Sequence, residues 1–137
     1  MLKWLWLTVL IIVLDLGSKS YFSSTMELYQ SIAIIEDFIN LNFNFTLVHN
    51  YGAAFSFLAD QSGWQRWFFT FVSSIISLVL LVWLYRLKAC EKLQAIALAL
   101  VLGGALGNLW DRMMVGYVVD FIDLFIKTKS LEWHWPA

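Results

Sequence analysis

Two long uncharged apolar runs constrain this chain more than any other feature. Residues 67–85 and 93–110 contain no Asp, Glu, Lys or Arg. Each run is close to the roughly 20 residues that an α-helix needs to cross about 30 Å of hydrocarbon. A third run, residues 3–22, has a similar length and is interrupted by Asp15 and Lys19. The sequence therefore predicts a membrane α-helical fold with three transmembrane helices in a single domain, residues 1–137.

The composition agrees with a membrane protein and argues against other classes. Of the 137 residues, 61% are hydrophobic and 14% are charged, whereas ordinary soluble domains are about 45–50% apolar and about 25% charged. A net charge of −1 gives no basis for nucleic-acid binding. With one cysteine, Cys90, and two separated histidines, we expect no disulfide framework, no metal site and no cofactor.

The N-terminus has some features of a cleaved signal peptide. Lys3 precedes an apolar stretch, as a charged region precedes the apolar core of a leader. However, Asp15 and Lys19 follow without an Ala-x-Ala-like cleavage site. A retained first transmembrane helix is the favoured interpretation.

The charges of the connecting segments predict the orientation in the membrane. Residues 20–65 contain four acidic residues and no Lys or Arg, whereas the connector after the second helix carries Arg86, Lys88 and Lys92. Positive charge stays on the cytoplasmic side. We therefore expect a cytoplasmic N-terminus, an outer loop at residues 23–65 and an outer segment at residues 111–137.

The outer loop has the pattern of a strand rather than of another helix. Residues 42–49 begin with alternating polar and apolar side chains, which is typical of a half-buried strand. Gly52 then supplies a turn-forming residue. The sequence predicts a small extracytoplasmic β-sheet, a β-cradle, in the first outer loop against the membrane.

This topology brings the polar residues of the apolar segments to one face of the bilayer. Charged side chains at membrane depth are expensive and usually functional. A site near the outer leaflet is therefore predicted from Asp15, Lys19, Asn50, Gly52, Asn108, Asp111, Arg112 and Asp120.

Two features of the helices each allow a structural and a functional interpretation. Asp15 and Lys19 are four residues apart on one helix face, so they form an ion pair that eases insertion and that could also brace the site. Gly103 and Gly107 have the spacing that lets helices approach closely. Alternatively, the glycine-rich surface lets a substrate backbone reach Asn108.

The residues after the third helix also allow two interpretations. Asp111 either pairs locally or belongs to the site. Arg112 either extends to lipid head groups or orients a substrate carbonyl or a catalytic carboxylate. Asp120 follows two β-branched residues and either caps the next element or is half of an aspartic dyad. In a dyad two close carboxyls share a proton, so one serves as base and the other as acid.

Four blocks of the sequence together resemble the bacterial lipoprotein signal peptidase family, signal peptidase II. They are residues 14–19 (LDLGSK), 48–57 (VHNYGAAFSF), 103–112 (GGALGNLWDR) and 116–121 (GYVVDF). Their order, spacing and membrane placement all agree with the family, and the match covers nearly the whole chain.

The resemblance implies an aspartic membrane endopeptidase that removes the signal peptide of a prolipoprotein, cutting before the diacylglyceryl-modified cysteine. It implies four transmembrane helices, contact with membrane lipid and inhibition by globomycin. Asp120 matches one catalytic aspartate. The resemblance assigns Asn50, Gly104, Asn108, Asp111 and Arg112 to the substrate and inhibitor site, and Asp15 and Lys19 to a supporting pair.

The sequence departs from the family in one respect. The second catalytic aspartate of the family lies in a Phe-Asn-x-Ala-Asp block that opens the fourth helix, and residues 1–137 do not contain this block. We therefore expect a C-terminally truncated, inactive chain. Replacement of the missing aspartate by Asp111, or by Asp123 one helical turn from Asp120, is a weaker alternative.

Two further functions stay open at the level of the sequence. One is a non-enzymatic membrane helper or transporter-like protein that uses the charged residues as a relay. Transporter sites usually lie near the bilayer midplane, whereas these residues gather at the outer end, which favours the peptidase. The other is a remnant that binds prolipoprotein without cleaving it.

Overall fold

Three long helices form the membrane part of the protein. The computed structural model describes residues 1–38, 41–52, 63–128 and 131–135. A short 3-10 helix, η1 (Leu2–Trp4), leads into α1 (Leu5–Thr25), which is followed later by α2 (Gln65–Arg86) and α3 (Lys92–Met114). All three α-helices are long and apolar enough to cross a membrane. The predicted membrane fold is confirmed.

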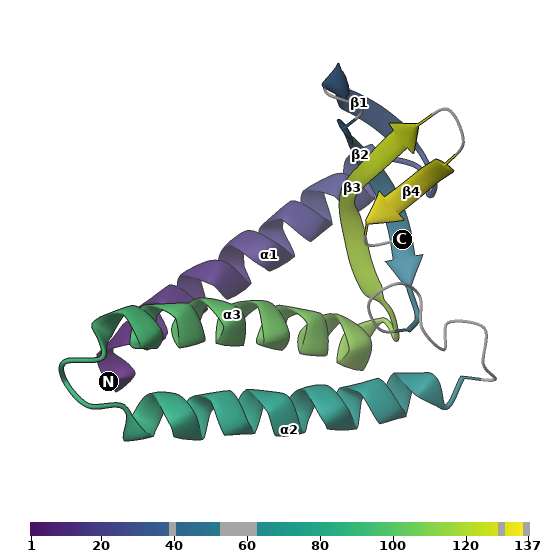
Figure 1. Ribbon diagram of the computed structural model, residues 1–137. Helices are drawn as coiled ribbons and strands as arrows, with labels where there is room; N and C mark the ends of the chain where they lie inside the picture. Colours follow the sequence, from purple (N-terminus) through teal and green to yellow (C-terminus); the bar gives the residue numbers. More distant parts are fainter. Residues whose placement is uncertain (39–40, 53–62, 129–130, 136–137) are drawn as a thin grey trace.

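The helices are arranged around α3, which contacts both α1 and α2 (Figure 1). Their outward faces carry exposed apolar side chains such as Trp67, Phe71 and Leu78, which are 66%, 66% and 61% exposed. Such a continuous apolar exterior suits lipid rather than water.

Glycine allows the close approach of α1 to α3. A methyl group at Gly103 would lie 2.6 Å from Cβ of Ile11, and one at Gly107 would overlap the carboxylate of Asp15. One turn away, the Thr8 hydroxyl donates a hydrogen bond to the Ala99 carbonyl at 2.8 Å. The predicted close helix packing at the glycine spacing is therefore confirmed.

A four-stranded antiparallel sheet sits at the end of the helices where α1 and α3 end and α2 begins (Figure 1). Its strands, in spatial order, are β1 (Ser31–Phe38), β2 (Leu41–Asn50), β3 (Val118–Thr128) and β4 (Leu131–Trp135). The predicted sheet is confirmed, but it is larger than the outer loop alone. Half of its strands come from the segment after α3.

A small apolar cluster joins this sheet to the end of α1. Met26, Leu47 and Val119 are buried, and Phe22 packs against them. The ring of Phe22 also stacks on that of Phe121 with centroids 4.3 Å apart. This contact holds β2 and β3 against the helix end that carries the polar residues.

Candidate functional site

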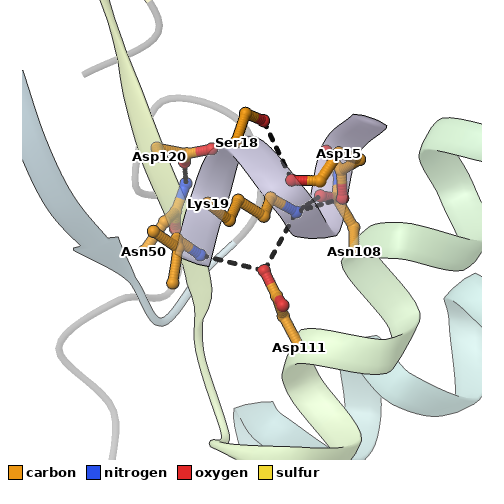
Figure 2. Close-up of polar contacts among 8 residues, drawn as sticks. Asp15, Ser18, Lys19, Asn50, Asn108, Asp111 and Asp120 are labelled. Atoms are coloured by element: carbon orange, nitrogen blue, oxygen red, sulfur yellow. Dashed lines mark hydrogen bonds and ion pairs between the residues drawn. The ribbon is translucent and has the colours of Figure 1, made fainter. Parts of the chain in front are cut away.

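Lys19 is a buried cation at the centre of the polar residues. Its side chain is fully paired, because the ammonium donates to Asn108 Oδ1 at 2.9 Å and forms ion pairs with Asp15 Oδ2 at 2.8 Å and Asp111 Oδ2 at 2.9 Å. The residue is 5% exposed. Figure 2 shows these groups converging from α1 and α3. The predicted pair of Asp15 and Lys19 is thus part of a larger network.

Asp111 ties three elements together. It lies in the last turn of α3, which continues to Met114 rather than ending at the predicted residue 110. Its carboxylate pairs with Lys19 of α1 and accepts a hydrogen bond from the Val119 N–H of β3 at 3.2 Å. The local pairing of Asp111 that the sequence suggested is therefore wrong, because its partners lie on other elements.

The glycines of α3 lie on two different faces of this helix. Side chains of α1 occupy the space beside Gly103 and Gly107, whereas a methyl group at Gly104 would meet no atom of the described residues within 4 Å. Gly104 therefore lies on an open surface, one turn before Asn108. An extended backbone could approach α3 closely at this position.

Arg112 links the part of the outer loop that directly follows β2 to α3. Its Nη2 donates to the Gly52 carbonyl at 3.0 Å, and its guanidinium lies 5.6 Å from the centroid of the Phe69 ring. This carbonyl belongs to the protein itself, so the predicted role of Arg112 toward a substrate carbonyl or a catalytic carboxylate stays a prediction.

Asn50 links this loop to Asp120. Its Oδ1 accepts from the Gly52 N–H at 2.9 Å, and its Nδ2 donates to Asp120 Oδ2 at 3.2 Å. The first bond closes a tight turn of the kind that Asn favours. Since that bond occupies the amide oxygen, the amide NH₂ is directed at the carboxyl of Asp120 (Figure 2).

The carboxyl of Asp120 has an unusual environment. Burial raises its pKa above the ordinary value, and the negative charge of Asp111 acts in the same direction. The Asn50 hydrogen bond and the positive charges of Lys19 and Arg112 oppose the rise without cancelling it. A carboxyl with a raised pKa can hold and release a proton at higher pH, which is the property that general acid–base catalysis uses.

Asp123 lies on the opposite face of the sheet from Asp120. Both residues are in β3, where side chains three positions apart point to opposite sides. Both residues pair with β2, where Asp120 is opposite Val48 and Asp123 is opposite Asn44. Between these two pairs β2 contains a bulge. Asp123 accepts a hydrogen bond from Thr46 at 3.2 Å. The helical turn considered for these two aspartates is therefore wrong.

His49 is a strand residue beside the site, as the sequence suggested. Its ring stacks on that of Tyr117 with centroids 4.0 Å apart, and burial lowers its pKa. Across the described ranges, no group of three or more His, Cys, Asp or Glu side chains is placed to hold a metal ion.

Sequence reasoning missed Arg66, which binds the end of α3. Its Nε donates to the Arg112 carbonyl at 3.0 Å. A signal was present, since Arg66 is the first positive charge after residues 20–65, which contain no Lys or Arg.

The fold and the site define a membrane protein with a network of charged and polar side chains at one end of three helices that are long and apolar enough to cross a membrane. A family model described as signal peptidase (SPase) II matches residues 7–137. The chain belongs to the signal peptidase II family, as the four sequence blocks indicated.

Curated relatives are similar in sequence to this chain over almost its whole length. A lipoprotein signal peptidase of Pseudomonas aeruginosa is 54% identical over 136 residues, which cover 99% of this chain and 76% of the relative. One from Photorhabdus laumondii is 50% identical over the same shares of both chains.

Two solved structures of a bacterial membrane enzyme have the same fold. One has a TM-score of 0.75 at 30% identity and covers 88% of this chain and 69% of the other. The second has a TM-score of 0.74 at 29% identity, with coverages of 88% and 73%.

Proposed function

We propose that this protein acts in the removal of signal peptides from diacylglyceryl-modified prolipoproteins, as an aspartic endopeptidase that cuts before the lipidated cysteine. The observation that carries the proposal is the half-buried Asp120 carboxyl, which has a raised pKa and accepts a hydrogen bond from Asn50 at the end of three transmembrane helices. Membership of the signal peptidase II family supports the reaction type.

In this proposal Asp120 and a second carboxyl share one proton. Water attacks the scissile carbonyl carbon while the ionised carboxyl takes a proton from the water and the protonated one gives its proton to the carbonyl oxygen. In the second step the carboxyl that took the proton from water gives it to the leaving amine nitrogen, and the other carboxyl takes a proton from a hydroxyl of the intermediate. The C–N bond breaks, and the pair of carboxyls again shares one proton. Burial favours the protonated form of Asp120, which suits it to the acid role in the first step.

The neighbouring residues are proposed to bind the substrate and the inhibitor globomycin. The open surface at Gly104 would let an extended signal peptide lie against α3, with the lipid chains of the substrate in the surrounding bilayer. Asp15 and Lys19 support this surface from within, because their ion pair also holds Asp111. The proposed binding residues are Asn50, Gly104, Asn108, Asp111 and Arg112.

We also propose that residues 1–137 alone do not cleave. Within the described ranges, Asp111 is engaged by Lys19 and Val119, and Asp123 faces away from Asp120. Neither is placed to share a proton with Asp120. The family resemblance assigns the second carboxyl to a Phe-Asn-x-Ala-Asp block, and the chain spans 76% of the length of the Pseudomonas aeruginosa relative.

The experiment compares two purified proteins in lipid nanodiscs. One contains residues 1–137 and the other continues into a fourth helix that begins with Phe-Asn-x-Ala-Asp, hereafter the extended chain. Each receives a diacylglyceryl-modified prolipoprotein and the same protein with its cysteine changed to serine. We expect the extended chain to cleave the lipidated substrate alone. Cleavage by residues 1–137, or equal cleavage of the serine form, contradicts the proposal.

The proposed location is the bacterial inner membrane, with the N-terminus in the cytoplasm and the site toward the outer leaflet. The connector with Arg86, Lys88 and Lys92 lies at the opposite end of the helices from the sheet (Figure 1). Positive charge at that end supports this orientation.

A further inference from the structure

Arg66 is the first positive charge after a stretch without any, since residues 20–65 contain no Lys or Arg. It is the second residue of α2. The beginning of α2 lies at the end of the helices where the sheet sits (Figure 1). The contacts of its guanidinium show what it does there.

The guanidinium of Arg66 binds the last turn of α3. Its Nε donates to the carbonyl of Arg112 at 3.0 Å and its Nη2 to the carbonyl of Met113 at 2.8 Å. The final carbonyls of a helix have no partner within the helix, and they carry the negative end of its dipole. The planar guanidinium supplies two donors at once, which the single ammonium of a lysine does not match.

The stem of Arg66 also fills the turn between α3 and β3. Gly116 is buried with a φ of +90°, and a methyl group there would lie 3.2 Å from Cδ of Arg66. The N–H groups of Val115 and Gly116 both donate to the Asp111 carbonyl, at 2.8 and 3.2 Å. The chain thus reverses tightly around Arg66 before β3 begins at Val118.

This turn separates two charged groups of the site, Arg112 and Asp120. Arg112 precedes it on α3, and Asp120 follows it on β3. On one side the Asp111 carboxylate ties α3 to the Val119 N–H. On the other side Arg66 ties α2 to the last carbonyls of α3.

We propose that Arg66 is a positioning residue, which fixes the turn from α3 to β3 and thereby sets the separation of the Arg112 guanidinium from the Asp120 carboxyl. Its importance for catalysis rests on the proposed function of Asp120. The geometry that it fixes can be measured without substrate, so the two proposals fail separately.

The test measures the titration of Asp120 by NMR in residues 1–137 with ¹³C-labelled aspartate, in nanodiscs. The Asp120→Asn variant assigns the signal. Lys19, Arg112 and Asp111 are the charged groups that act on this carboxyl. In Arg66→Lys the last turn of α3 loosens and the opposing charge of Arg112 withdraws, so the pKa of Asp120 rises further.

The matched control is Arg86→Lys, the same change on the same helix at the far end, roughly 30 Å away for 20 helical residues. It should leave the Asp120 titration unchanged. If Arg66→Lys titrates like Arg86→Lys, the proposal is overturned, because a purely structural cap would change stability and not this titration.

A second pair of variants tests the turn itself. Gly116→Ala and Gly63→Ala both place alanine at a positive φ, of +90° and +95°, but a methyl group meets Arg66 at Gly116 and nothing within 4 Å at Gly63. Both variants should lose stability, and Gly116→Ala alone should shift the Asp120 titration. Equal titrations in the two variants contradict the proposal.

Discussion

Replacing Lys19 with methionine tests whether the buried charge network holds the site together. Methionine keeps the length and apolar character of the lysine stem and removes the ammonium. The change leaves Asn108 Oδ1 without its donor and the carboxylates of Asp15 and Asp111 without their cation. The side chains of these aspartates are 24% and 10% exposed, respectively, so water can replace the cation only in part.

The burial of these side chains determines how much stability the variant is expected to lose. Removing one partner of a buried ion pair typically costs about 3–5 kcal/mol, since the other charge stays buried. The Val119 N–H continues to stabilise the Asp111 carboxylate. We expect Lys19→Met to lower the free energy of unfolding by about 3–5 kcal/mol.

The assay is unfolding of residues 1–137 by sodium dodecyl sulfate in mixed micelles, followed by tryptophan fluorescence. Lys92→Met is the matched control, because Lys92 is an exposed residue at the start of α3 and its replacement should change stability by no more than about 0.5 kcal/mol. The double variant Lys19→Met/Asp111→Asn should recover part of the loss, since it removes one unpaired charge. The reasoning is refuted if the free energies of unfolding of Lys19→Met and Lys92→Met differ by less than about 1 kcal/mol, because breaking a buried ion pair costs several times more.

Three more predictions use the same protein. Gly107→Ala should destabilise it by about 1–3 kcal/mol, because the methyl group overlaps the Asp15 carboxylate, whereas Gly104→Ala meets open space and should change stability little in the same unfolding assay. Because the folded-state pKa of Asp120 is raised, its ionisation destabilises the fold as pH rises from about 4. Asp120→Asn should therefore be more stable than the parent chain at pH 7 and lose this advantage below about pH 4. Cys90 is exposed in the connector between α2 and α3, so a membrane-impermeant thiol reagent should label it in inverted vesicles and not in intact spheroplasts.

The helices of this fold were predictable because uncharged runs of membrane length leave few alternatives. Their ends were less predictable. The prediction ended the third helix at residue 110 because Asp111 and Arg112 are charged, yet α3 continues to Met114. Both charges find partners on other elements, Asp111 on α1 and β3 and Arg112 at Gly52, and this pairing keeps them within the helix.

The sheet and the site show where sequence reasoning stops. Alternation identified β2, but its pairing with β3 joins Asn50 to Val118 across a long stretch of chain, and such pairing depends on packing against α1. The predicted topology placed the polar residues together at one end of the helices. It could not show that Lys19 bridges Asp15 to Asp111, because a helical i, i+4 pattern specifies one partner and not two.

The central claim is that Asp120 is one of two catalytic carboxyls. The most direct measurement compares Asp120→Asn with Asp123→Asn in the extended chain, using cleavage of a diacylglyceryl-modified prolipoprotein. Both variants make the same change in β3, on opposite faces of the sheet. The account predicts that Asp120→Asn stays folded and loses at least about 1,000-fold in kcat, on the scale of other catalytic side chains, while Asp123→Asn cleaves like the parent chain. Comparable turnover by the two variants would contradict it.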